Sequence, residues 1–391
     1  MRSGCIPAHN VGLPRAGRIL IVVWAAGGNV VPVAGLARVL SSRGHDVRVL
    51  GPSVLRKRFE QTGCTFRPFQ RAHQPNLVEE EVFDEHLLAW TRFIAGSRLA
   101  DDVSAELDRE TADAVIVDAF LFAALSAVEK AGVPAVALVH VLYQPYVEGL
   151  MATQGDPTRP FVDATRERLG LSPLDSASPL ASALWSRASV VLACVPEPFD
   201  FPLSNVTTNL RYVGPIFEDA PDESTQSGHS LALVSFGTTN MHQGPVLQRV
   251  LDALASLDLE VLCTLGGVSI EELRPPDNAR IRDWVPHMAV LSHTSAVITH
   301  AGLSTVMSAL ANGVPLVCMP MGRDQPLNAD RVVALGVGRQ ISGESSVNVI
   351  RAAVEDVLGD FNFRREAQRM AEVIAGYGNG SKAASEVEGL L

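Results

Sequence analysis

Short apolar runs alternate with amphipathic segments along most of the chain. The runs are three to seven residues long, which is the length of buried strands. Between them, apolar residues recur at helical spacing, as Val33, Leu36 and Leu40 do. Strand, helix and strand in succession predict parallel sheets with right-handed crossovers. The runs predicted as strands are 18–24, 47–50, 64–68, 114–117, 135–139, 190–195, 231–235, 296–298 and 316–319.

The tripeptide Gly-Val-Pro occurs twice in the same setting, at 132–134 and at 313–315. Each copy ends a predicted helix and precedes an apolar strand, which indicates two similar doubly wound halves. An acidic, serine-rich stretch lies between the halves and is typical of a linker. The predicted division is a flexible tail at 1–17, a first domain at 18–213, a linker at 214–230, a second domain at 231–372 and a terminal helix within 373–391.

One stretch, 284–328, brings together groups suited to a charged ligand. Within it a strand ends at Ile298 and a helix starts near Leu303, so a tight corner of small residues joins them. Free N–H groups and the helix dipole make such a corner an anion site. The candidate ligands there are His300, Ala301, Gly302, Ser304 and Thr305, with hydroxyl and imidazole donors for a phosphate.

Two further features flank this corner in the sequence. Asp324 and Gln325 follow the next predicted strand, and a carboxylate beside a carboxamide suits sugar hydroxyls, which both donate and accept hydrogen bonds. Trp284 precedes the corner, next to Val285, and its indole face suits stacking on a nucleobase. A buried core indole and a capped-turn histidine are the ordinary interpretations of Trp284 and His300 taken singly. Their spacing favours a nucleotide-sugar site.

The pattern W-x-P…H-A-G-x-x-T…G-V-P…D-Q-x-x-N-A resembles the nucleotide-sugar signature of family-one, GT-B-fold glycosyltransferases. The resemblance is strongest to bacterial natural-product enzymes that glycosylate macrolides, enediynes and aromatic polyketides. It implies an α/β protein of GT-B architecture, with two Rossmann-like domains facing a central cleft. The first domain then binds the acceptor and the second binds the donor, and the terminal helix packs back on the first domain.

The resemblance also implies chemistry. It indicates an inverting, metal-independent sugar transfer in which the nucleotide sugar is a cosubstrate and no cofactor is needed. The loop at Gly237 and Thr238 would face the donor diphosphate, although an ordinary strand-to-helix turn is the simpler interpretation of that loop. Gly237 favours the functional interpretation because glycine permits close approach of the backbone.

The expected catalytic pair is incomplete. Relatives carry a histidine in G-H-x-x-P paired with an aspartate after the fourth strand. Here the aspartate position is Asp118 and the histidine position is Asn29, whose amide cannot accept a proton near neutral pH. Asn29 also suits a helix N-cap. Three functional alternatives remain: Asp118 or the nearby His140 is the base, the acceptor is acidic enough to need little help, or an auxiliary protein contributes. A combination of the first two is preferred.

Ser308 is a second departure, since relatives generally have a glutamate there that holds the ribose hydroxyls. A short neutral side chain favours a deoxyribose donor such as a dTDP-sugar, with UDP as the alternative. Ser308 is also compatible with an ordinary serine on the helix surface.

Aromatic side chains gather in two parts of the first half. The group between 83 and 93 has helical spacing, so a helical core is its simpler explanation. The segment 141–158 follows the carboxyl end of a strand, where α/β sheets bind ligands, and is predicted as an acceptor loop for an apolar aglycone. The candidate acceptor residues are Phe83, Trp90, His140, Tyr143 and Tyr146.

The composition of the chain limits the kinds of partner that it is expected to bind. The chain has 391 residues and a formal net charge of −11, so nucleic acid is not an expected partner. Five scattered cysteines are typical of reduced thiols in a cytoplasmic protein. No apolar run is long enough for a membrane span, and no metal-ligand spacing is present. A homodimer or an auxiliary activator protein stays open, as do two other functions: a non-catalytic nucleotide-sugar-binding partner of another transferase, and a sugar-nucleotide epimerase.

Overall fold

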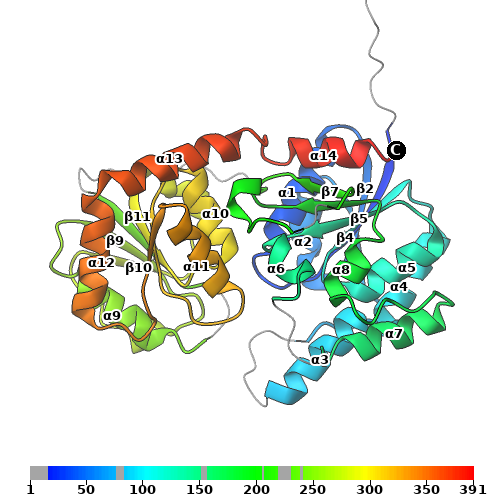
Figure 1. Cartoon of the computed structure of the whole chain (residues 1–391), viewed down its shortest axis with the longest axis horizontal. Coiled ribbons are helices and arrows are strands. Elements are labelled where there is room, and N and C mark those ends of the chain that lie inside the picture. Colours follow the sequence, from blue (N-terminus) through cyan, green and yellow to red (C-terminus); the bar gives the residue numbers. More distant parts are fainter. Residues whose placement is uncertain (1–15, 76–82, 151–155, 205–206, 219–229, 238–240) are drawn as a thin grey trace, which may run out of the picture.

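The computed structural model of the chain describes residues 16–75, 83–150, 156–204, 207–218, 230–237 and 241–391. Two parallel sheets organise these residues, and each lies between helices (Figure 1). The expected tail at 1–17 lies almost entirely outside the described residues, as does most of the expected linker.

The first sheet has seven strands in the order β3-β2-β1-β4-β5-β6-β7, and all neighbours are parallel. Parallel strands that are buried on both faces need continuous apolar sequence. This explains why short apolar runs predict strands in this chain. The strands are β1 (Arg18–Val22), β2 (Asp46–Gly51), β3 (Thr65–Pro68), β4 (Ala114–Asp118), β5 (Ala135–Val139), β6 (Val190–Ala193) and β7 (Leu210–Tyr212). The helices are α1 (Val30–Ser42), α2 (Arg56–Glu60), α3 (Phe83–Ala95), α4 (Ser97–Arg109), α5 (Phe122–Ala131), α6 (Tyr143–Val147), α7 (Arg159–Arg168) and α8 (Leu180–Trp185).

The second sheet has six parallel strands in the order β10-β9-β8-β11-β12-β13. They are β8 (Leu231–Ser235), β9 (Glu260–Thr264), β10 (Ala279–Arg282), β11 (Thr294–Thr299), β12 (Leu316–Cys318) and β13 (Gly338–Gln340). The helices are α9 (Gly244–Leu254), α10 (Leu303–Ala311), α11 (Gln325–Ala334), α12 (Val347–Gly359), α13 (Phe361–Ala375) and α14 (Ser381–Glu388). The strands at β8, β11 and β12 agree with the sequence prediction to within one or two residues.

The last two helices connect the two sheets. In Figure 1, α13 runs along the second sheet and α14 lies over the first, beside α1. Ala383, Ala384 and Val387 on α14 are buried with the apolar residues of α1. At the rim of this contact, Arg43 pairs with Glu388 at 2.7 Å. The end of the chain therefore belongs structurally to the first sheet.

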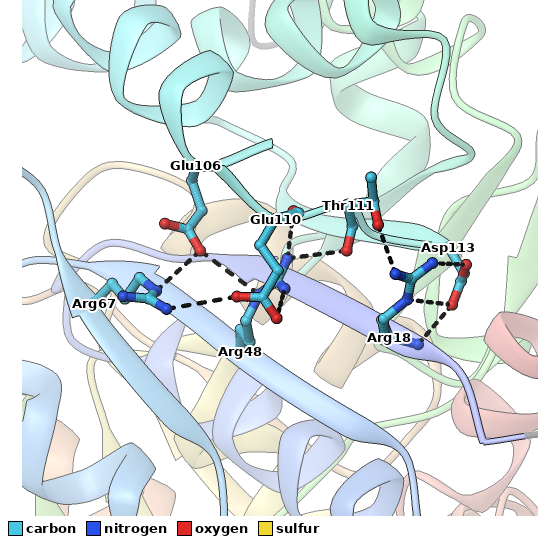
Figure 2. A network of polar contacts seen from close by, with 7 residues as sticks. All are labelled: Arg18, Arg48, Arg67, Glu106, Glu110, Thr111 and Asp113. Atoms are coloured by element: carbon cyan, nitrogen blue, oxygen red, sulfur yellow. Dashed lines mark hydrogen bonds and ion pairs between the residues drawn. The ribbon is translucent and has the colours of Figure 1, made fainter. Parts of the chain in front are cut away.

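A polar network fastens α4 to the edge of the first sheet (Figure 2). Arg48 on β2 is almost fully buried and pairs with Glu110, while Arg67 on β3 lies 3.1 Å from Glu106. Buried charges are tolerated only when they are paired, and here carboxylates from α4 compensate both arginines. The network thus holds α4 against the sheet, and α4 also packs against α5.

No described helix is both long enough and apolar enough to cross a membrane. The four cysteines in the described part of the chain, Cys64, Cys194, Cys263 and Cys318, are buried free thiols.

Candidate active site

The corner after β11 has the geometry that its sequence predicts. β11 ends at Thr299, Ala301 adopts a left-handed backbone with φ +68°, and α10 starts at Leu303 after Gly302. The first intrahelical bond comes from the N–H of Val306, so the preceding N–H groups of the helix remain available to an anion. Ser304 is exposed at this end, and Thr305 is buried beside it.

His300 is held between two glycines. A Cβ on Gly302 would lie 2.6 Å from Nε2 of His300, and one on Gly237 would lie 2.8 Å from the same atom. Both positions therefore require glycine if the ring is to stay where it is. Burial lowers the pKa of His300 to about 4, so the imidazole is neutral at neutral pH. His300 thus offers a hydrogen bond and no charge. Thr238, expected beside Gly237, lies outside the described residues.

A second neutral histidine lies behind this corner. His287 Nε2 is 3.1 Å from Oγ of Ser235, and burial lowers the pKa of His287 to about 4 as well. Ser235 in turn accepts a hydrogen bond from Thr264 Oγ1 at 3.0 Å. The carboxyl ends of β8 and β9 therefore carry an uncharged hydrogen-bonded chain, in which His287 is a satisfied internal residue.

Trp284 is 67% exposed in the segment between β10 and a short turn of 3₁₀ helix at His287–Ala289. The interpretation of this residue as a buried core indole is therefore wrong. Val285 beside it is buried and anchors the segment. An exposed indole on an anchored segment can stack on a planar ring.

Asp324 and Gln325, at the start of α11, have different environments. Asp324 Oδ2 accepts a hydrogen bond from Asn328 Nδ2 at 3.0 Å, and the same Nδ2 donates to the carbonyl oxygen of Ala301 at 3.0 Å. Gln325 is 4% exposed, and its Oε1 accepts from the N–H of Met321 at 2.8 Å. The carboxamide of Gln325 therefore shapes the loop before α11. Asn328, which the sequence analysis did not select, ties Asp324 to the His300 corner; its spacing of four residues from Asp324 was the available signal.

Ser308 lies one turn into α10 and is only 5% exposed. Its hydroxyl donates to the carbonyl oxygen of Ser304 at 2.9 Å. The alternative of a helix-surface serine is therefore wrong, since this side chain bonds back to its own helix.

On the first sheet, three polar side chains from separate segments converge at the carboxyl ends of β1, β4 and β5. Asp118 Oδ2 accepts from Asn29 Nδ2 at 2.8 Å, and Asp118 Oδ1 lies 3.2 Å from His140 Nε2. Asn29 also accepts from the N–H of Ala26 and donates to the carbonyl oxygen of Trp24, both at 3.0 Å. Asn29 occupies the N-cap position of α1, but its side chain makes no capping hydrogen bond and is used in the contacts with Ala26, Trp24 and Asp118 instead.

The carboxylate and the imidazole differ in exposure. The side chain of Asp118 is 0% exposed, whereas that of His140 is 15% exposed. Burial alone would lower the pKa of His140, but the charge and hydrogen bond of Asp118 outweigh it, together with Asp324 and a bond to its own backbone. The pKa of His140 is consequently raised above its usual value. His140 is the open end of a buried carboxylate–imidazole pair.

The two halves of the site face each other. A Cβ on Gly28, next to Asn29, would lie 3.5 Å from Cβ of Ser304 at the start of α10. The charge of Asp324 also raises the pKa values of His140 and Tyr146, so α11 and the end of β5 are electrostatic neighbours. The pair on the first sheet therefore lies opposite the anion corner on the second.

The aromatic residues expected to bind an acceptor do not form one group. Tyr146 is half-buried, with its ring 5.2 Å from that of Phe120, and Phe120 lies 5.5 Å from His140. Tyr143 is 3% exposed and stacks on Trp185 at 5.7 Å. Tyr143 therefore belongs to the core, because 141–158 is not one open loop: α6 begins at Tyr143, and 151–155 lie outside the described residues.

The remaining candidates lie on α3. Phe83 is its first residue, and Trp90 is half-buried with its ring 5.1 Å from that of Trp24. Gln74 is a further residue that the sequence analysis missed: its side chain accepts from the N–H of Ala25 and donates to the carbonyl oxygen of Ala25, both at 2.7 Å. Gln74 thereby fixes the loop that carries Asn29. No local pattern marks a loop glutamine for this role.

Comparison with known proteins shows which proteins this chain resembles. Residues 248–389 match the family model described as Erythromycin biosynthesis protein CIII-like, C-terminal domain. The chain is 29% identical to 4'-demethylrebeccamycin synthase of Lentzea aerocolonigenes, over 96% of this chain and 99% of the relative. It is 28% identical to demethyllactenocin mycarosyltransferase of Streptomyces fradiae, over 98% of this chain and 88% of the relative.

Solved structures agree on the fold. The glycotransferase of kitacinnamycin superposes with a TM-score of 0.82 at 23% identity, covering 97% of this chain and all of that one. The glycosyltransferase VinC superposes with a TM-score of 0.74 at 20% identity, covering 95% of this chain and 99% of that one. The expected GT-B fold is confirmed.

The two sheets, with a polar site between their carboxyl ends, have the GT-B architecture of the solved structures named above. The chain is similar to natural-product glycosyltransferases of antibiotic biosynthesis, including the two relatives named above. This similarity identifies it as an enzyme that transfers sugar to an aglycone. Among the described residues, no cluster of three or more His, Cys, Asp or Glu side chains could hold a metal ion.

Proposed function

We propose that the protein transfers a sugar from a nucleotide diphosphate donor, preferably a dTDP-deoxysugar, to an apolar aglycone with inversion at the anomeric carbon. The observation that carries this proposal is the approach of the Asn29–Asp118–His140 group to the start of α10. Opposed acceptor and donor groups suit a single displacement, which inverts configuration.

The donor half binds the nucleotide in three places in this proposal. Trp284 stacks on the base, the N–H groups at Gly302 and the start of α10 bind the diphosphate with His300, and Asp324 binds the sugar. Ser304 and Thr305 donate hydroxyls to the phosphate oxygens, while Val285, Ala301 and Gln325 act through their positions in the backbone. Because the helix N-terminus and neutral donors meet the developing negative charge of the leaving diphosphate, no metal ion is needed.

The preference for dTDP rests on Ser308 and on one structural neighbour. A serine whose hydroxyl is bonded to its own helix cannot reach a ribose as a glutamate would, so a 2′-hydroxyl gains little here. VinC, which has the same fold, was solved in complex with dTDP. UDP remains the competing nucleotide in any test.

His140 and Asp118 act together on the acceptor. Asp118 accepts bonds from Asn29, His140 and the N–H of Phe120, so its oxygens are occupied and it serves to orient and charge-balance the imidazole. His140, the more exposed member of the pair, takes the acceptor proton. An acceptor of low pKa, such as a phenol, would give up its proton more readily and would need a weaker base. Tyr146 and Trp90 are the proposed apolar contacts of the aglycone, and the side chain of the third candidate, Phe83, lies outside the described part of the structure.

Product analysis tests the proposal. The wild-type chain is incubated with dTDP- and UDP-sugars and a panel of aglycones, and the products are identified by mass spectrometry and the anomeric configuration by NMR. The expected result is acceptor-dependent release of nucleotide diphosphate, faster with dTDP-sugars, still present after EDTA treatment and lost in Asp118→Asn. Nucleotide binding without any release, across the whole panel, would instead identify a binding protein.

A further inference from the structure

A cavity of about 770 Å³ lies in the first domain, and its described lining residues include none of the donor-site or catalytic residues described above. It is enclosed by α3, α4 and α7 and by the segment that ends at Pro75. Its volume falls within the range of small-molecule sites. The lining is mainly apolar, with Phe93, Leu99, Phe161, Ala72, Ala89 and Ala164 among its residues.

Among the described residues that line this cavity, the charged side chains all have one sign. Arg92, Arg98 and Arg168 line it, and no described lining residue is acidic. This is the reverse of the whole chain, which has 43 acidic and 32 basic residues. A random selection of surface from this protein would be net negative, so the basic rim is a local property of the cavity.

Two of these arginines have no partner within the described chain. Arg168 pairs with Asp101 at 2.5 Å and donates to the carbonyl oxygen of Ser97 at 3.2 Å. Arg92 and Arg98 are exposed and form no ion pair with a described residue. Their guanidinium groups are therefore available to an external anion at the mouth of an apolar cavity.

The cavity wall is also connected to the catalytic loop. The ring of Phe93 lies 6.2 Å from that of Trp24, whose carbonyl oxygen binds Asn29. Ala72 is fixed by a 2.9 Å bond from its N–H to Asp102, and two residues later Gln74 bonds to Ala25 on the loop of Asn29. This wall is thus built from anchored residues, which is a requirement for a pre-formed binding site.

We propose that this cavity is a second ligand site, separate from the donor site, which binds an apolar molecule that carries an anionic end group. The apolar body lies against Phe93, Leu99 and Phe161, and the anion binds Arg92 and Arg98 at the mouth. Because its lining contains none of the donor-site or catalytic residues, its occupancy does not depend on whether the sugar transfer proposed above is correct.

Calorimetric titration with three probes of equal chain length tests the site: dodecanoate, dodecyltrimethylammonium and dodecanol, each below its micelle concentration. Dodecanoate is expected to bind saturably with one site per chain, about tenfold or more tightly than the cation. Saturating dTDP should leave this affinity unchanged. Equal affinity for the three probes, competition by dTDP, or no saturable binding would each overturn the proposal. Dodecyl phosphate in the same titration distinguishes a phosphate end group from a carboxylate.

Variants locate the binding. The double variant Arg92→Gln/Arg98→Gln should weaken dodecanoate about tenfold and leave dodecanol unchanged, because both side chains are exposed and only the charge is removed. Ala89→Phe should reduce the binding of all probes by filling the cavity. The matched control is Arg109→Gln, an exposed arginine at the far end of α4, which should change nothing. Wild-type affinity in the double variant, with circular dichroism unchanged, would place dodecanoate elsewhere and reject this site.

Discussion

The two halves of the active site use opposite electrostatic means. The half on the second sheet offers helix N–H groups and two histidines that burial keeps neutral, with pKa values of about 4. The half on the first sheet contains a buried carboxylate and a histidine whose pKa is raised by it. Neutral donors suit a ligand that brings its own negative charge, whereas a paired imidazole suits the acceptance of a proton. The contrast indicates a division of labour between binding and proton transfer.

The largest expected effect comes from removing the imidazole of the first half. His140→Gln keeps a polar side chain beside Asp118 but cannot accept a proton, so kcat should fall by about 10²- to 10⁴-fold. Asn29→Ala removes hydrogen bonds to Asp118, Ala26 and Trp24 but no proton acceptor, and should cost about tenfold or less. Steady-state kinetics with a fixed donor and acceptor would measure both. Near-wild-type kcat in His140→Gln would mean that the base lies elsewhere.

The pH profile sharpens this assignment. Since the pKa of His140 is raised above about 6.5, kcat/KM should decline as the pH falls through that higher value, when the imidazole becomes protonated. In His140→Gln this acid limb should disappear along with most of the activity. Asn29→His/His140→Gln returns a histidine to the position before α1, and a partial recovery of kcat is expected there because Asp118 is within reach of both positions.

Acid should destabilise the protein through the second half. His287 and His300 have folded pKa values of about 4, below the usual 6.5, so the unfolded chain takes up protons first as the pH falls. Their contribution is fully present above pH 6.5 and is lost between about pH 6.5 and 4, at about 2–3 kcal/mol per histidine. Urea unfolding at pH 7 and pH 4.5 measures this loss.

The double variant His287→Gln/His300→Gln isolates these two groups from the carboxylates that titrate in the same range. Its free energy of unfolding should depend less on pH than that of the wild type, whatever its absolute stability. His293→Gln is the control, since His293 is exposed on the same segment. An unchanged pH dependence in the double variant would show that the pKa values of these two histidines do not differ between the folded and unfolded states.

The same contrast explains what the sequence revealed. The donor half lies within 45 consecutive residues, 284–328, so its corner, glycines and polar side chains could be seen together. In the first half, Asn29, Asp118 and His140 are far apart in the sequence, and it was the resemblance to known glycosyltransferases that singled out the positions of Asn29 and Asp118. The strand order β1-β4-β5 brings these three side chains into contact. Gln74, which follows β3 and bonds to Ala25, was missed.

Sequence reasoning also failed where tertiary packing decides exposure. Tyr143 was expected to face an acceptor, but α6 turns its ring onto Trp185. Gln325 was expected to bind sugar, but the loop before α11 uses its amide oxygen. The sequence does not show whether an aromatic or amide side chain faces a ligand or the core, because both surroundings can stabilise it.

A moderate effect is expected where the second half is most tightly packed. Gly302→Ala adds a methyl group 2.6 Å from His300 Nε2, so the ring must move away from the start of α10. The KM for the donor should rise about 10- to 100-fold, while the KM for the acceptor changes little. Gly359→Ala is the matched control because a Cβ there meets nothing within 4 Å. A donor KM that is unchanged in Gly302→Ala would remove His300 from the donor site.

The smallest expected effect concerns the contact between the halves. Arg331 on α11 donates to the carbonyl oxygens of Phe199 and Pro198, each at 3.0 Å, and its guanidinium lies 5.1 Å from the centre of the Phe201 ring. Asp200, within that segment, accepts the N–H of Tyr143 at the start of α6 at 2.8 Å. Arg331 thus connects the helix that carries Asp324 to the helix that carries Tyr146.

Arg331→Ala should therefore lower kcat by about three- to tenfold, as the donor and acceptor lose their fixed separation, and leave the dissociation constant for dTDP unchanged. Arg331→Lys should recover little, because an ammonium cannot repeat the planar, two-carbonyl contact. The control Arg339→Ala removes an arginine of the same domain that contacts Phe363 within its own half. If Arg331→Ala weakened dTDP binding as strongly as it lowered kcat, α11 itself would have been disturbed, and the loss of kcat would not report the separation of the two halves.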